Sequence, residues 1–161
     1  MKNYTTPNYY QLGEWIDAWQ EPLYRYAFFR LGRRDEAEDV VQDAFLKIAS
    51  SSIQIKNPKA YLFRMVANGC VDTLRRRGRN ISLASQTATP AENYDTEAEE
   101  EYQRIAALLS HLHEKEAEVI RLHIHAGLKF TEIAELLDTP ATTLKSRFAS
   151  GITHLRQMLI N

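Results

Sequence analysis

The chain has 161 residues, of which 44% are hydrophobic and 25% charged, with a formal net charge of −1 and a single cysteine. This composition suits a globular protein with a packed core, and one cysteine excludes an internal disulfide framework. No stretch reaches the roughly 18 consecutive apolar residues of a membrane span, and the polar start lacks a signal core, so we expect a cytoplasmic protein without membrane insertion.

The charges are unevenly distributed along the chain. Residues 1–79 carry 13 Lys/Arg against 9 Asp/Glu, residues 80–101 carry 6 acidic residues and no Lys/Arg, and residues 102–161 carry 7 Lys/Arg against 6 Asp/Glu. The near-neutral total therefore hides two mildly basic blocks separated by an acidic strip, which leaves nucleic-acid binding open.

Apolar periodicity predicts three helices at the start of the first block. We expect helices over Tyr9–Gln20 and Pro22–Leu31, because proline fits a first helical turn and Gly32 can end the second helix. Asp35 can cap a third helix, with Glu38 three residues later as in a capping box. From there apolar residues recur at helical spacing: Ala37, Val40, Val41, Ala44, Phe45 and Ile48.

A polar loop over Ser50–Lys56 precedes a long helix. Asn57 can cap this helix, Pro58 can begin it, and Gly78 is expected to end it after Arg77. Its polar residues are spaced by four, four and three positions, so they stack along one stripe: Arg64, Asn68, Asp72 and Arg75.

Four arginines lie within five positions at the end of this helix: Arg75, Arg76, Arg77 and Arg79. Their guanidinium groups repel one another unless they are solvated or lie near phosphates. A solvated helix C-terminus, which also favours cations, is the alternative explanation. The stripe that leads into the cluster favours nucleic acid, since asparagine can read a base edge and arginine can hold the backbone.

The second half of the chain is also predicted to be helical. Residues 80–96 indicate a flexible acidic linker. Helices are then expected over Glu97–Leu112 and Glu114–Ala126, with Ile124 buried in the latter and Gly127 ending it. Thr131 can cap a short helix, Asp138 and Thr139 can form a turn, and Pro140 can begin a final helix. The apolar stripe of that final helix consists of Leu144, Phe148, Ile152, Leu155 and Leu159.

The segment Phe130–Arg156 has the proportions of a helix-turn-helix: a short helix, a tight turn and a longer helix. In such units the second helix presents its N-terminal part to the DNA major groove. An ordinary helical hairpin with a solvated face is the alternative. The residues that face away from the apolar stripe, and are candidate DNA contacts, are Thr142, Thr143, Lys145, Ser146, Arg147, Ala149 and Ser150.

Neither metal binding nor catalysis has positive support in the sequence. His111, His113, His123 and His125 form His-x-His pairs, whose members point to different faces of a helix and chelate poorly. No phosphate-binding, nucleophile or dinucleotide motif is present. We therefore expect no enzyme, no cofactor and no metal.

Three segments together resemble the extracytoplasmic-function sigma factors of the sigma-70 family. Residues 35–47 are similar to the core-polymerase-binding helix of that family, residues 57–77 to its promoter −10 helix, and residues 127–147 to its −35 helix-turn-helix. The segments occur in the family's order, with a linker between the second and the third. The resemblance implies an all-α fold of two small helical domains, residues 1–79 (region two) and 97–161 (region four), joined by a flexible acidic linker, residues 80–96.

The resemblance also implies roles for particular residues. Region two binds the clamp helices of the polymerase's largest subunit, through positions that match Asp39, Gln42, Asp43 and Phe45. The Ser50–Lys56 loop matches a segment that captures a flipped base of the −10 strand, Asn68 matches a position that helps to read that element, and Arg75–Arg79 would hold the backbone. Region four binds the −35 duplex and the flap of the second-largest subunit.

This chain departs from the family pattern where basic residues are usual, at Ser150 and Ile152, so we expect weak −35 binding by the isolated protein. The leading interpretation is a promoter-specificity factor for a stress or envelope signal, with core RNA polymerase, promoter DNA and an anti-sigma factor as partners. The alternative is a sigma-like binding module that sequesters a regulator without initiating transcription.

Overall fold

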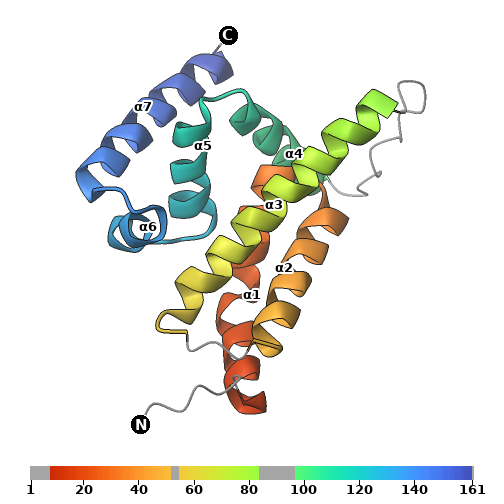
Figure 1. Ribbon diagram of the computed structural model, residues 1–161. Coiled ribbons are helices and arrows are strands. Elements are labelled where there is room, and N and C mark those ends of the chain that lie inside the picture. The colour runs from red at the N-terminus through yellow and green to blue at the C-terminus, as the bar shows by residue number, and fades with distance from the viewer. Residues whose placement is uncertain (1–7, 52–54, 84–96, 161) are drawn as a thin grey trace.

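The computed structural model describes residues 8–51, 55–83 and 97–160, and of residues 80–83 only the backbone. Every element in those ranges is a helix, as the sequence predicts (Figure 1). The bounds are α1 Tyr9–Leu31, α2 Arg34–Ala49, α3 Pro58–Leu83, α4 Glu97–Ser110, α5 Glu114–Ile120, the π-helical segment η1 Arg121–His125, α6 Phe130–Leu137 and α7 Ala141–Ile160.

Helix α1 is one helix of 23 residues, so the prediction of two helices over this segment is wrong. Pro22 lies inside α1 and removes one backbone hydrogen bond there. The apolar face nevertheless continues across the proline, because Trp15 and Trp19 pack against the same core that Leu23 enters. The predicted end is confirmed: Gly32 adopts a left-handed conformation with φ 74° and donates its amide to the carbonyl of Phe28.

The ends of α2 and α3 differ in part from the prediction. Asp35 does not cap α2, which begins at Arg34 with Arg33 as an N-cap that makes no side-chain hydrogen bond. Asp35 instead lies in the first turn, where its charge favours the helix dipole. The predicted cap of α3 is confirmed, since Asn57 Oδ1 accepts a hydrogen bond from the amide of Ala60 at 3.1 Å.

Helix α3 does not end at Gly78 but continues to Leu83. Gly78 does not have a positive φ, and a Cβ built on it meets nothing within 4 Å, so nothing at this residue forces a turn. The first four residues of the predicted linker are therefore helical, and residues 84–96 lie outside the described residues.

Helices α1, α2 and α3 pack into a three-helix bundle. Its core includes the buried residues Leu23, Tyr26, Val41, Ile48, Leu62, Phe63 and Val66. The crossing of α2 and α3 is close, because a Cβ on Gly69 would lie 2.8 Å from Cγ1 of Val40. The free Cys70 is fully buried here, and burial raises the pKa of its thiol to about 12.

The second group of helices contains one irregular turn. After α5 the chain widens into η1, where the amide of Ala126 donates to the carbonyl of Arg121 at 2.9 Å. The wider turn changes which side chains face inward, so that Ile124, expected in the core, is 51% exposed. Gly127 ends the segment with φ 72°, as predicted.

Helices α6 and α7 form the predicted helix-turn-helix, with Asp138 in a left-handed conformation at the turn. Thr131 is not the cap of α6: Lys129 is the N-cap, and its amide donates to Glu132 Oε1 at 3.0 Å. The predicted apolar stripe of α7 is buried or half-buried from Leu144 to Leu155, but Leu159 is 64% exposed at the end of the helix.

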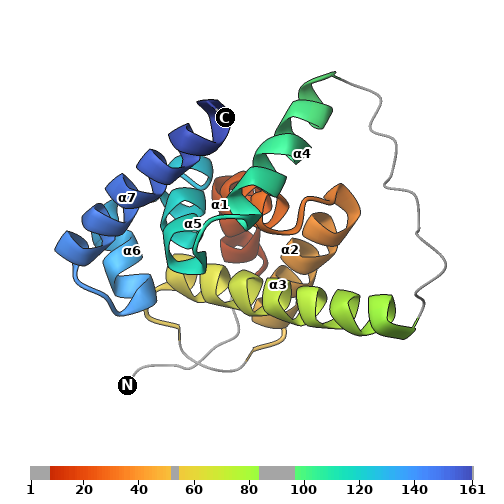
Figure 2. The same cartoon turned by 90° about the horizontal axis from the view of Figure 1, so that it is seen from above.

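The two groups of helices pack against each other. Helix α1 contacts α4 and η1, and α3 contacts α6. Seen from above, α2 lies on one side of α1 and α5 on the other, and α3 runs along the edge of the molecule with its start beside α6 (Figure 2). One continuous apolar cluster joins Leu23 and Phe29 of the first group to Ile120 and Leu122 of the second.

Candidate nucleic-acid and polymerase interfaces

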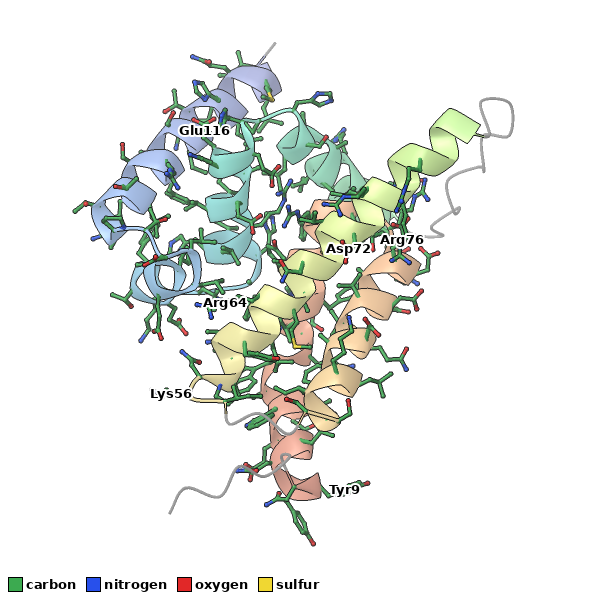
Figure 3. The ribbon with its side chains drawn as sticks, viewed as in Figure 1. Tyr9, Lys56, Arg64, Asp72, Arg76 and Glu116 are labelled. Carbon is green, nitrogen blue, oxygen red and sulfur yellow. The ribbon has the colours of Figure 1, made fainter. Side chains whose placement is uncertain are left out.

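The polar stripe of α3 is accessible along its length. Arg64, Asn68 and Asp72 are exposed, and Arg75 Nη1 lies 3.8 Å from Asp72 Oδ1 on the surface. Arg64 lies on the part of α3 beside the C-terminal helices, and Asp72 and Arg76 lie farther along the helix (Figure 3). The structure thus brings the four predicted residues onto one surface of a single helix.

The four arginines at the end of α3 do not share one environment. Arg75, Arg76 and Arg79 are exposed. Arg77 turns inward: its Nη2 donates to the carbonyl of Leu31 at 3.0 Å and to Glu36 Oε2 at 2.8 Å. Since its guanidinium joins α3 to the end of α1 and to α2, Arg77 holds the bundle together and does not extend toward solvent as a phosphate contact would.

The N-terminal half of α7 carries the predicted −35 residues. Thr142, Lys145 and Ser146 are exposed, whereas Thr143 and Arg147 are half-buried. The small Ala149 is also exposed. The small or hydroxyl side chains allow close approach to a DNA backbone, and Lys145 and Arg147 each supply one positive charge.

Ser150 makes an internal contact. Its hydroxyl donates to Glu116 Oε2 at 2.5 Å, and His154 Nδ1 lies 3.0 Å from Glu116 Oε1. The hydrogen bond from Ser150 lowers the pKa of Glu116, against the opposing effect of burial. A Cβ on Gly151 would lie 2.9 Å from Ile120, so α5 and α7 cross closely here. Glu116, labelled in Figure 3, therefore fixes α7 on α5, and Ser150 takes part in that contact.

The polar face of α2 presents Asp39, Gln42 and Asp43, all exposed. Asp43 pairs with Lys47 at 3.0 Å across one turn. Phe45, expected to contact the polymerase, is only 8% exposed and belongs to the bundle core, so it supports the helix from within. The neighbouring Leu46 is 63% exposed and is the apolar side chain that this helix offers to a partner. The periodicity already placed Phe45 in the buried stripe, and Leu46 outside it.

The predicted base-capturing loop is described only at its ends. Residues 52–54 lie outside the described residues. Ser50 bonds to the carbonyls at the end of α2, and Lys56 is exposed beside the start of α3 (Figure 3).

A cluster of polar side chains that the sequence analysis did not predict lies between the two groups of helices. Arg121 is 2% exposed; its Nε donates to the carbonyl of Phe29 at 3.2 Å and its Nη1 to Glu114 and Glu118 at 3.2 and 3.4 Å. Tyr26 Oη donates to Glu118 at 2.5 Å and accepts from Arg30 at 2.7 Å. We call Tyr26, Arg30, Glu114, Glu118 and Arg121 the interdomain cluster.

The interdomain cluster balances two arginines against two glutamates. Arg30 also lies 3.5 Å from Glu114 and 3.7 Å from Glu118. Burial, and then the neighbouring Glu118 carboxylate, raise the pKa of Tyr26 well above its usual range, so its hydroxyl remains a donor. The one feature of the sequence that points to this cluster is Arg121, a charged residue within the apolar run Val119–Leu122.

A second polar contact joins the start of α3 to α6. Lys59 Nζ lies 2.8 Å from Glu132 Oε2, Asn57 Nδ2 donates to Glu135 Oε1 at 3.3 Å, and Arg64 Nη2 donates to the carbonyl of Glu135 at 3.4 Å. Burial opposes ionisation of Glu132, but the Lys129 amide and the Lys59 ammonium outweigh it and lower its pKa.

Two histidines of the second group, His123 and His125, take part in ring packing. His123 stacks on Phe130 at 4.1 Å between ring centroids, and its Nδ1 lies 2.8 Å from the carbonyl of Leu128. His125 stacks on Phe29 at 3.7 Å, and burial lowers its pKa to about 4. Within the described ranges, no three His, Cys, Asp or Glu residues are arranged to hold a metal ion, and no helix is long and apolar enough to cross a membrane.

Comparison with known proteins identifies the two halves. Residues 15–80 match the family model of sigma-70 region 2, and residues 102–155 match that of sigma-70 region 4. The chain is 30% identical to the ECF RNA polymerase sigma factor SigL of Mycobacterium tuberculosis, over 85% of this chain and 82% of SigL. It is also 30% identical to the ECF RNA polymerase sigma-E factor of Haemophilus influenzae, over 80% of this chain and 75% of that protein.

Two solved structures share the fold. One is the sigma factor RpoE in complex with the anti-sigma factor NepR from Bartonella quintana, with a TM-score of 0.68 and 24% identity over 91% of this chain and 95% of that one. The other is CnrH in complex with the cytosolic domain of CnrY, with a TM-score of 0.73 and 23% identity over 94% and 89% of the two chains. Sigma factors are not a class of enzymes. The chain belongs to the extracytoplasmic-function group of the sigma-70 family and is an RNA polymerase sigma factor.

Proposed function

We propose that α3 recognises the promoter −10 element and that α7 docks on the −35 duplex. The observation that carries this is the exposed row on α3, formed by Arg64, Asn68, Asp72 and Arg75 and continued by Arg76 and Arg79. Such a row supplies an amide that can read a base edge and guanidinium groups that can hold phosphates on either side of it. Residues 1–79 and 97–161 then act as regions two and four, with residues 80–96 connecting them.

The polar face of α2 binds the clamp helices of the polymerase's largest subunit. Asp39, Gln42 and Asp43 supply the polar contacts, and the exposed Leu46 supplies an apolar anchor among them. Phe45 contributes by holding α2 in place. Region four also contacts the flap of the second-largest subunit.

Recognition of the −35 element depends on tethering. Lys145 and Arg147 are the basic residues in the first half of α7, Arg147 is half-buried, and Ser150 is bonded to Glu116. Few phosphate contacts give weak binding by the isolated chain. Core polymerase compensates, because holding region two at the −10 element raises the effective concentration of region four at the −35 element.

Regulation by an anti-sigma factor is supported by one of the two structural relatives, the sigma factor RpoE, which is bound to the anti-sigma factor NepR. We place the protein in the cytoplasm with the polymerase, without catalytic activity of its own, and in a regulon for stress or envelope signals. The alternative, a module that sequesters a regulator without initiating transcription, does not explain an exposed Asn68 among several exposed arginines.

In vitro transcription with core RNA polymerase tests the proposal. Reconstituted holoenzyme should give transcripts from specific promoters in a genomic library, and Asn68→Ala should reduce them while leaving core binding intact. Glu101→Gln, which removes an exposed carboxylate on α4, is the control. Core binding without any promoter-specific transcript would favour the sequestering module.

A further inference from the structure

Helix α3 carries a carboxylate in the middle of its exposed row. Asp72 lies four residues after Asn68 and three before Arg75, and all three side chains are exposed. The Asp72 side chain is 64% exposed, and Arg75 Nη1 lies 3.8 Å from its Oδ1, beyond the usual length of a hydrogen bond. The carboxylate oxygens of Asp72 therefore remain available to a ligand that approaches this face of α3.

A negative charge on a DNA-binding row calls for a physical reason, because it repels the phosphates of the bound DNA. An exposed ion pair such as the one between Asp72 and Arg75 contributes little to offset that repulsion. A carboxylate that accepts a hydrogen bond from a base edge, in contrast, gains a contact that depends on the DNA sequence. The place of Asp72, one turn from Asn68, favours contact with a base edge.

The backbone beneath Asp72 is held firmly, as a side chain that reads a base requires. A Cβ on Gly69 would lie 2.8 Å from Cγ1 of Val40, so α3 rests directly on α2 within one turn of Asp72. Cys70, two residues before Asp72, is fully buried on the inner side of α3. The opposite side of the same turn, which carries Asn68 and Asp72, therefore faces outward on a fixed support.

The chemistry of a carboxylate selects cytosine among the four bases. In the major groove guanine and thymine present acceptor atoms, which repel a carboxylate, and only cytosine N4 and adenine N6 are donors. Adenine N6 lies beside the N7 acceptor, whereas cytosine N4 has no acceptor beside it on that edge. Asn68 differs from Asp72, because its amide carries both a donor and an acceptor and suits adenine.

We propose that Asp72 is a specificity-determining residue that reads a cytosine in or next to the −10 element. Four residues of an α-helix advance about 6 Å, and successive bases lie about 3.4 Å apart, so this cytosine lies one or two positions from the base that Asn68 reads. Arg75 and Arg76 hold the phosphates beside it. This inference rests on the proposed function, since it assigns α3 to the −10 element.

In vitro transcription from a promoter library tests the inference. The library randomises the −10 element and the base pairs next to it on both sides, and core polymerase loaded with the full chain transcribes it. Wild-type transcripts should favour cytosine at one position of one strand by at least about tenfold over guanine or thymine. Asp72→Ala should abolish this preference. Asp72→Asn should shift it toward adenine, because an amide pairs with adenine N6 and N7.

Two further variants separate base reading from other roles of Asp72. Arg75→Ala should weaken transcription from all library members alike and leave the cytosine preference in place. If Asp72 only positioned Arg75, Asp72→Ala would give that same uniform loss. Glu101→Gln removes an exposed carboxylate of α4 and should change neither the yield nor the preference. Thermal unfolding of each variant verifies that it is folded.

The outcomes separate the inference from the proposed function. Wild-type transcripts without a cytosine preference, or a preference that Asp72→Ala leaves unchanged, would overturn the reading of cytosine by Asp72. A uniform loss in Asp72→Ala would overturn it as well. In each of these cases the proposed function stands if Asn68→Ala still reduces transcription. If the wild-type protein directs no promoter-specific transcript, the proposed function fails and the inference fails with it.

Discussion

Arg77 should behave differently from the two arginines beside it. In the sequence it is one of three consecutive arginines, but in the structure it is half-buried and its guanidinium bonds to α1 and α2, while Arg75 and Arg76 are exposed. We expect Arg77→Ala to destabilise the fold, and Arg76→Ala to weaken DNA binding without affecting stability.

The magnitude follows from the bonds that Arg77 makes. Its Nη2 bonds to Glu36 at 2.8 Å, a charge-assisted contact worth about 1.5–3 kcal/mol when buried. It also bonds to the carbonyl of Leu31 at 3.0 Å, one of the carbonyls that the end of α1 leaves without a helical partner. Because both charged groups retain some solvent contact, at 24% and 18% exposure, we expect a loss of about 2 kcal/mol.

Thermal unfolding followed by circular dichroism measures the effect. A loss of about 2 kcal/mol lowers the Tm of a chain of this size by about 4–8 °C. Arg77→Lys should recover only part of it, because an ammonium group lacks the planar fork that reaches both acceptors. Binding to a −10 oligonucleotide is measured in parallel at a temperature where all variants are folded. An unchanged Tm for Arg77→Ala, together with weakened DNA binding, would refute the assignment of Arg77 to the bundle.

Three further predictions concern other helices. Phe45→Ala should lower the free energy of unfolding by about 3–5 kcal/mol in urea titration, whereas Leu46→Ala should leave it nearly unchanged and weaken binding to core polymerase; equal destabilisation by both would contradict their burial. Glu116→Ala removes the contact that fixes α7 on α5 and should therefore weaken −35 binding by the holoenzyme several-fold. The measurement compares promoters with and without a −35 element, and a loss of binding to both kinds of promoter would indicate unfolding of region four instead. The pKa of His125 is about 4 in the fold against about 6.5 in an unfolded chain, so the unfolded chain binds a proton first and the fold loses stability as the pH falls through 6.5 toward 4. The fall in Tm between pH 7.5 and 5.5 should therefore be smaller in His125→Phe than in the wild type. An equal fall in both proteins would exclude this histidine as the cause.

Most of the fold could be predicted because its signals are local. Helical periodicity, the Asn57-Pro58 start of α3 and the left-handed Gly32 and Gly127 all depend on residues within one or two turns. The helix-turn-helix was predicted for the same reason. The errors at Pro22 and Gly78 have a common cause: a residue that permits a break does not require one when the apolar face continues or nothing crowds the backbone.

The sequence predicted those features of the candidate site that lie on a single helix, but not those that depend on contacts between helices. Spacing placed Arg64, Asn68, Asp72 and Arg75 on one stripe, and they are exposed there. Spacing could not show which of the arginines meets α1 and α2, because that depends on how α3 packs. Arg121 bonds to a carbonyl 92 residues away, a contact that no local pattern records.

Several cations of this near-neutral chain are paired with carboxylates inside the fold and are not available to DNA. Arg30, Arg77 and Arg121 are held by carboxylates within the fold, and Lys59 is held by Glu132 of α6. Each cation that reaches a phosphate steepens the salt dependence of DNA binding by about one. The count of basic residues therefore says little about affinity for DNA, because a cation held by a carboxylate within the fold does not reach a phosphate.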